Sequence, residues 1–422
     1  MDRRFFIKNS GIALAGFGMA AAAPDVLQRI VSASVNGTAP RRKTLVVVFQ
    51  RGAVDGLSMV PPFGDGNYSS ARRNLAVPKP GAEGGAVDLD GFFGLHPSMS
   101  ALAPLWKDRA LAVVHSAGSP DNTRSHFDAQ DYMEAGTPGV KSTRDGWMNR
   151  LLQNHVDKDA TPFRAVAMTQ QVPRSLVGRY PTVAMTNLQT FAIRAGSYTN
   201  SVSGGFEDLW RQESEGRLGE TGKETFEAIE FLKKSDPGRY TPGNGARYPA
   251  GPFGESMRQI AQLIKAGVGL ETAFTDTPGL NWDTHANQAN GNGSRGQLAN
   301  LLRNYGEALG AFAKDLGPKV MEDVLVVTMS EFGRTVRENG SRGTDHGHGN
   351  AMLLFGGGVN GGKVYGNWKG LSSSALYEGR DLAVTTDFRD VLSEVSTGFL
   401  GARDGTGIFP GYKGGGRLGL FG

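Results

Sequence analysis

Two short runs of the chain combine carboxylate and imidazole side chains at a spacing that could bind a metal ion. NWDTHANQ places Asp283 two residues before His285, and TDHGHG places His346 two residues before His348, with Asp345 beside them. In an extended backbone, side chains at i and i+2 point the same way, so each pair could converge on one ion. The two runs therefore make these five residues candidate metal ligands.

The ligand types narrow the choice of metal. The chain has no cysteine, and carboxylate and imidazole ligands without thiolate suit zinc or manganese, bound as one ion or as a two-ion cluster. The alternative is that these Asp and His residues cap helices and satisfy turns, which is the more common use of a single such pair. Two runs at the same predicted edge of a sheet favour metal binding.

Short apolar runs separated by helical patterns predict the elements that hold these residues. Continuous hydrophobicity indicates strands that are covered on both faces, and it is found at residues 44–49, 110–115, 324–329 and 351–356, with 162–168 as a further candidate. Helical patterns lie between them, at 98–107, 125–135, 254–267, 297–316 and 387–399. This order predicts an α/β fold, a three-layer α/β/α sandwich with a mostly parallel central sheet. Residues 137–250 are rich in Gly, Pro and Ser and predict a lid-like insertion, with an independent second domain as the alternative.

Polar residues follow the predicted strands at the points where they end. The run at 44–49 is followed by Arg51 and Asp55, and the run at 324–329 by Glu331 and Arg334. The run at 110–115 is followed by Thr123, Arg124, Ser125 and His126. In open α/β sheets, ligands bind outside the carboxyl ends of the strands. We therefore expect these residues to share one rim with the two metal-binding runs.

Ser125 lies where a loop enters a predicted helix. A helix N-terminus favours anions, so the hydroxyl is well placed to attack a phosphorus or sulfur centre; the alternative, which is compatible with it, is a plain N-cap. Arg51, Arg124 and Arg334 could hold the substrate oxyanion, with His126 as a further substrate contact. The alternative for the arginines is a surface salt bridge.

The N-terminus predicts export. MDRRFFIKNSGIALAGFGMAAAAP has paired arginines followed by Phe, Phe and Lys and then a short apolar run rich in Gly and Ala. This layout is similar to a twin-arginine signal, and the apolar run is a poor bilayer span. We expect residues 1–34 to be a signal peptide that engages the twin-arginine translocase and leaves a periplasmic or secreted protein with no stable membrane anchor.

The charge of the chain argues against a nucleic-acid-binding protein, and its lack of cysteine excludes a fold held together by disulfides. The formal charge is +4, and removal of residues 1–34 leaves about +2, which gives no electrostatic case for nucleic acid. With no cysteine there are no disulfides, so the exported fold must be stable through its core alone.

Four longer runs around these residues resemble a known family. They are VVVFQRGAVDGLSMVPP, LAVVHSAGSPDNTRSHFDAQDYMEAG, NWDTHANQ and VVTMSEFGRT…GTDHGHGN, and they look like the DUF1501 family of exported bacterial proteins. The resemblance predicts one domain over residues 43–422. That family is itself similar to the alkaline phosphatase and sulfatase superfamily, whose members typically bind two metal ions at the carboxyl edge of an α/β sheet and cleave phosphate or sulfate esters.

The resemblance implies roles for single residues. Asp55 looks like the aspartate ligand of the first strand, and Asp283 with His285 resembles the Asp/His ligand pair. Glu331 stands where the superfamily has Asp, and Phe332 where it has His, so the resemblance implies a replacement ligand from Asp345, His346 or His348. Ser125 resembles the nucleophile, with Thr123 as its rival.

The resemblance predicts an exported metal-dependent hydrolase of phosphate mono- or diesters, with sulfate esters second. Because the chain has no cysteine, and no Ser-x-Pro/Ala-x-Arg sequence surrounds the candidate nucleophile Ser125, the formylglycine mechanism of ordinary sulfatases is excluded, which favours phosphate. The substrate would be a small-molecule or polymer ester. The alternative, favoured by Phe332, is a non-catalytic exported protein that binds a metal or a surface polymer. A third possibility is transfer or isomerisation chemistry at the same rim.

Overall fold

A mixed sheet forms the centre of the protein in the computed structural model, which describes residues 42–154, 160–189, 240–403, 405 and 407–422. Within these residues the sheet has nine strands in the order β10-β4-β9-β8-β1-β7-β5-β6, with β11 paired to β4. Their bounds are β1 Thr44–Phe49, β4 Leu111–Gly118, β5 Ala165–Ala167, β6 Val183–Ala184, β7 Thr272–Asp276, β8 Val324–Met329, β9 Asn350–Gly356, β10 Lys363–Tyr365 and β11 Thr386–Asp387. A separate hairpin pairs β2 (Val87–Asp88) with β3 (Gly94–Leu95).

Strand direction places several loops at one edge of this sheet. β1 pairs in parallel with β7 and with β8, whereas β9 runs antiparallel between β8 and β4. The carboxyl ends of β1, β4, β7 and β8 therefore meet at the same edge, and β9 begins there. The predicted mostly parallel α/β sheet is confirmed.

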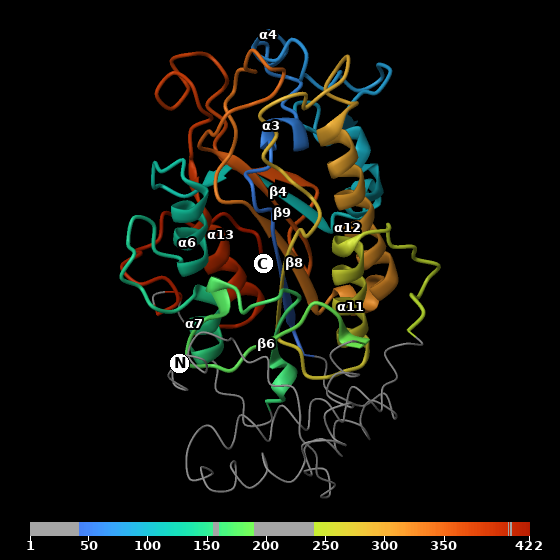
Figure 1. The fold of residues 1–422 in the computed structure, drawn as a ribbon, viewed down its shortest axis with the longest axis vertical. Coiled ribbons are helices and arrows are strands. Elements are labelled where there is room, and N and C mark those ends of the chain that lie inside the picture. Colours follow the sequence, from blue (N-terminus) through green and yellow to red (C-terminus); the bar gives the residue numbers. More distant parts are fainter. Residues whose placement is uncertain (1–41, 155–159, 190–239, 404, 406) are drawn as a thin grey trace, which may run out of the picture.

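Helices cover both faces of the sheet (Figure 1). Alternate residues of β1 enter different cores: Val46 and Val48 pack with α11 and α12, while Leu45 and Val47 pack with α7 and α13. This two-sided burial is the physical reason for the unbroken apolar runs. The α-helices are α3 Gly56–Met59, α4 Tyr68–Ala71, α5 Ala103–Lys107, α6 His126–Ala135, α7 Trp147–Asn154, α11 Pro252–Lys265, α12 Gln297–Met321 and α13 Phe388–Glu394. Shorter turns are η1 Pro97–Leu102, η2 Pro162–Arg164, η3 Arg174–Leu176 and the π-helical η5 Val395–Phe399.

The predicted strands at 44–49 and 324–329 match β1 and β8, and the other two long runs match β4 and β9 within a few residues. β7 was not predicted. The predicted insertion, 137–250, begins with α7 and with β5 and β6, which extend the main sheet. Its central part, 190–239, and the predicted signal peptide, 1–34, lie outside the described residues. Among the described helices, none is long and apolar enough to cross a bilayer.

Candidate metal centre

Residues 330–350, between β8 and β9, fold back on themselves at the carboxyl edge of the sheet. Arg334 and His346 form an antiparallel bridge, and the Gly333 amide donates to the His348 carbonyl at 2.8 Å. A Cβ atom on Gly347 would lie 2.4 Å from the Arg334 carbonyl carbon, so this close approach requires glycine. The turn carries the His346 side chain back towards the end of β8.

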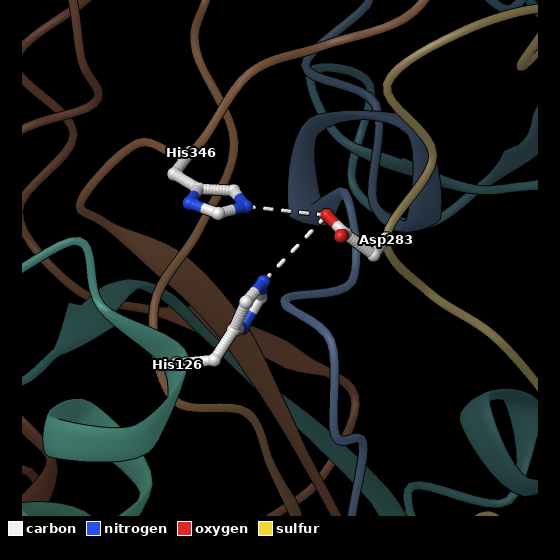
Figure 2. Close-up of side chains that lie close together, drawn as sticks. All are labelled: His126, Asp283 and His346. Carbon is white, nitrogen blue, oxygen red and sulfur yellow. Dashed lines mark hydrogen bonds and ion pairs between the residues drawn. The ribbon is translucent and has the colours of Figure 1, made fainter.

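Three side chains from distant segments converge beside this turn (Figure 2). His126 comes from the first residue of α6, Asp283 from the loop after β7, and His346 from the turn. One potential ligand atom from each lies within 4.8 Å of the other two. The Asp283 Oδ1 atom is 3.2 Å from His346 Nε2 and 3.6 Å from His126 Nε2. Among the described residues this is the one group of this kind.

His285 lies against the same group on its more exposed side. Its Nε2 atom is 3.0 Å from Asp283 Oδ1 and 3.0 Å from His346 Nε2. The predicted convergence of Asp283 and His285 is therefore present. Asp345 is not within this contact but accepts a hydrogen bond from His285 Nδ1 at 3.1 Å.

Hydrogen bonds at Nδ1 fix the tautomer of all three rings. His126 Nδ1 donates to a Glu331 carboxylate oxygen at 2.8 Å, and His346 Nδ1 donates to the Arg124 carbonyl at 2.9 Å. Because carbonyls and ionised carboxylates only accept, each neutral ring carries its proton on Nδ1 and a lone pair on Nε2. Three lone pairs thus face one carboxylate oxygen, which also accepts from Arg334, and a metal cation could be bound at the centre of this group.

The geometry fits a metal ion. His126 Nε2 is buried and has no hydrogen-bond partner among the described residues, although buried polar atoms are normally paired. Tetrahedral ligands at the usual zinc distances lie about 3.3 Å from one another, close to the 3.0, 3.2 and 3.6 Å separations from Asp283 Oδ1. The donor set of imidazole nitrogens and a carboxylate suits zinc or manganese.

The charges behind the ligands keep the carboxylates ionised. Burial alone would raise the pKa of Glu331, but hydrogen bonds from His126, Gln130 and the Gly52 amide hold it below its ordinary value. Burial also opposes ionisation of Asp283, and the Arg334 guanidinium outweighs it and lowers the pKa of that carboxyl. Both acids are therefore poised to bind or orient a cation at neutral pH.

Arg334 is buried, and its guanidinium hydrogen-bonds to groups of the protein itself. It donates to the carbonyls of Ala53, Thr344, Gly52 and Trp282 and, at 2.5 Å, to Asp283 Oδ1. With only 1% of its surface exposed, it holds Asp283 in place rather than presenting a free guanidinium to substrate. This differs from the oxyanion contact that the sequence predicts for Arg334.

A family model described as a protein of unknown function, DUF1501, matches residues 42–397. The chain belongs to the DUF1501 family. The crystal structure of the PsFucS1 sulfatase from Pseudoalteromonas sp. is similar to the chain at 14% sequence identity and a TM-score of 0.35, over 81% of this chain and 68% of that chain. No match is found among curated proteins.

Phe332 packs against the ligand rings in this DUF1501 protein. Its ring stacks on His126, with centroids 5.0 Å apart, and lies 5.1 Å from the His346 ring. The residue is 3% exposed. Phe332 therefore supplies the apolar wall that fixes two imidazoles, while His126 and His346 supply the nitrogens.

Of the other predicted ligands, Glu331 and Asp345 hydrogen-bond the Nδ1 atoms of His126 and His285, and Asp55 and His348 lie apart from the group. Asp55, the residue before α3, is completely buried and accepts hydrogen bonds from Arg72, Ser58 and Gln288. His348 is buried against Tyr377, with ring centroids 4.6 Å apart. The structure does not bring either residue into the group.

The predicted nucleophile and arginines lie around the centre. Ser125 is exposed and is flanked by Arg124, whose carbonyl binds His346, and by His126. The Thr123 hydroxyl accepts from the Ser125 amide at 3.2 Å. Arg51 pairs with Glu134 and Asp276, and the Arg124 side chain pairs with Glu378 and Asp381. Substrate binding by Arg51 and Arg124 stays a prediction, whereas His126, predicted as a substrate contact, lies in the candidate metal group.

Sequence reasoning missed the residues that support this group. Gln130 donates to Glu331 at 2.8 Å from the second turn of α6, and Arg72 donates to Asp55 at 2.5 Å. Gln288 ends the NWDTHANQ motif, so its place in that run was the available signal. Nothing in the sequence marks Arg72, whose partner is seventeen residues away along the chain.

We expect Arg72→Met to destabilise the protein strongly. It leaves the Asp55 carboxylate buried without its cation, and breaking a buried pair in this way costs about 3–5 kcal/mol of unfolding free energy. Urea unfolding at pH 7 measures the change. Arg295→Met is the control, because Arg295 pairs with Glu83 at the exposed surface; equal effects of the two substitutions would contradict the prediction.

Proposed function

We propose that this DUF1501 protein is an exported, metal-dependent hydrolase of phosphate esters, with sulfate esters as the second substrate class. In this proposal residues 1–34 direct export by the twin-arginine route. Residues 43–422 form one alkaline phosphatase-like domain. The mixed, mostly parallel sheet between two helical layers and a group of polar residues at its carboxyl edge are what such a fold requires.

One observation carries the proposal. Three imidazole Nε2 lone pairs face the Asp283 carboxylate, and each ring is oriented by an acceptor at its Nδ1 atom. His126, Asp283 and His346 would hold the ion, with His285 on the exposed side. Catalytic zinc sites use three protein ligands and leave one position for water or substrate, and the half-exposed His285 lies where such a position would open to solvent.

A divalent ion at this centre supplies Lewis-acid stabilisation of the charge that develops on an ester oxygen. The chain supplies the nucleophile and its surroundings. The Ser125 side chain does not cap α6, so the first amides of that helix are available to an anion. The Ser125 Oγ would attack phosphorus as the bond to the alcohol breaks, with the hydroxyl proton leaving on the alcohol, and water would then release phosphate.

The absence of a free arginine among the three predicted oxyanion contacts favours an alternative. Arg51 and Arg124 are paired with carboxylates, and Arg334 is buried. A protein with the same fold could therefore bind a metal, or a surface polymer through it, without turnover. A metal-loaded protein that turns over no phosphate or sulfate ester would select this alternative.

We expect the purified folded protein to contain zinc or manganese, at about one ion per chain for the one group described. The double variant H126A/H346A removes two of the three proposed ligands and should contain no bound ion. His348→Gln is the control, because His348 lies outside the group. Elemental analysis of the wild type, the double variant and His348→Gln measures the metal content of each. An equal metal content in the wild type and the double variant would refute the proposed centre.

We expect Ser125→Ala to abolish turnover, by at least about 10³-fold, while metal content stays unchanged. The substitution removes the attacking oxygen but touches none of the proposed ligands. The assay is a panel of phosphomonoester, phosphodiester and sulfate ester substrates with the bound metal. Retained activity would move the nucleophile to Thr123 or exclude covalent catalysis.

A further inference from the structure

A buried glutamine joins the two loops that carry the proposed ligands. Gln288 is 1% exposed, and its Oε1 atom accepts from the Thr284 hydroxyl at 2.9 Å and from the Thr344 hydroxyl at 2.9 Å. Thr284 lies between Asp283 and His285, and Thr344 lies two residues before His346. One amide oxygen therefore bridges the two loops, beside the backbone hydrogen bond from the Thr344 amide to the Thr284 carbonyl at 3.2 Å.

The other end of the amide is anchored to an ion pair. Gln288 Nε2 donates at 2.6 Å to the Asp55 Oδ2 atom, which also accepts from Arg72 at 2.5 Å. Because a carboxylate only accepts, the NH₂ group must face Asp55 and the amide oxygen must face the two threonines. The hydrogen-bond partners of Gln288 thus determine which end of its amide is the NH₂ group and which is the oxygen.

Arg72 extends the same network to the first half of the turn that carries His346. Its Nε and Nη2 atoms donate to the carbonyls of Val336 and Thr335, each at 2.9 Å, directly after Arg334 in the turn. Arg72, Asp55 and Gln288 are all buried. A fully buried polar chain of this kind has few alternative arrangements, so a change at one member moves the loops bound to the others.

We infer that Gln288 is a positioning residue that sets the metal affinity of the centre by holding the Asp283–His285 loop against the turn that carries His346. It touches none of the proposed ligand atoms. The inference rests on the proposed function, since it concerns the same centre. It also gives Asp55 a role that does not require metal contact: its carboxylate orients the glutamine.

The test compares Zn²⁺ affinity of the full chain, by competition with a chelator, in the wild type, Gln288→Met and Thr344→Val. Methionine has a similar length but no hydrogen-bonding amide, and we expect it to weaken Zn²⁺ binding by about 10- to 100-fold, as loss of groups that orient ligands does. Thr344→Val removes one hydroxyl and keeps the side-chain shape, so it folds with less disturbance and should weaken binding less.

Gln259→Met is the matched control. Gln259 is also 1% exposed, and its amide likewise donates and accepts, with Glu255 and Leu188 as partners, but it lies on α11. We expect it to lower the urea midpoint while leaving Zn²⁺ affinity unchanged, which separates positioning from general stability. Wild-type affinity in both Gln288→Met and Thr344→Val would overturn the inference alone. A wild type that binds no Zn²⁺ or Mn²⁺ would overturn the proposed function, and this inference with it.

Discussion

The buried guanidinium of Arg334 is the constraint on which the arrangement of the rim depends. A charge taken out of water needs compensation from every direction, and Arg334 finds it in the loop after β1, the loop after β7 and its own returning turn. Each of those segments belongs to a different part of the chain. Satisfying one planar, five-donor group therefore forces three loops to a common point, and Asp283 is the carboxylate they bring there.

The ligand rings are oriented by groups that differ in strength and exposure. His126 is held by the buried Glu331 carboxylate and by the Phe332 ring, whereas His285 depends on Asp345, which is 53% exposed at its side chain. The inner side of this group, at His126, is therefore held more firmly than its outer side, at His285. This asymmetry would suit a metal centre that holds its ion from within and admits another molecule from solvent, because exposed polar contacts exchange readily with water.

The sequence predicted the sheet better than it predicted the rim. An unbroken apolar run such as VLVVTM is typical of a strand that is buried on both faces, so β1 and β8 could be located from their residue types alone. The strand TAFTD at β7 could not, because its threonines break the apolar run and its identity comes from pairing with β1 and β5. Asp55 follows β1 closely and was therefore predicted at the rim, but its carboxylate is buried in an ion pair with Arg72.

The two i, i+2 pairs show why spacing alone could not define the centre. Asp283 and His285 meet at 3.0 Å, in a segment whose backbone turns tightly, with the Thr284 amide donating to the Trp282 carbonyl and the His285 amide to the Asp283 carbonyl. His346 and His348 have the same spacing but separate, since the backbone between them packs tightly on Arg334 and permits only glycine at position 347. His348 then packs on Tyr377, and its place near Asp283 is taken by His126, from a segment more than 150 residues earlier. Whether an i, i+2 pair converges therefore depends on the local backbone, and at position 347 the backbone of Arg334 and Thr335 lies too close for any side chain.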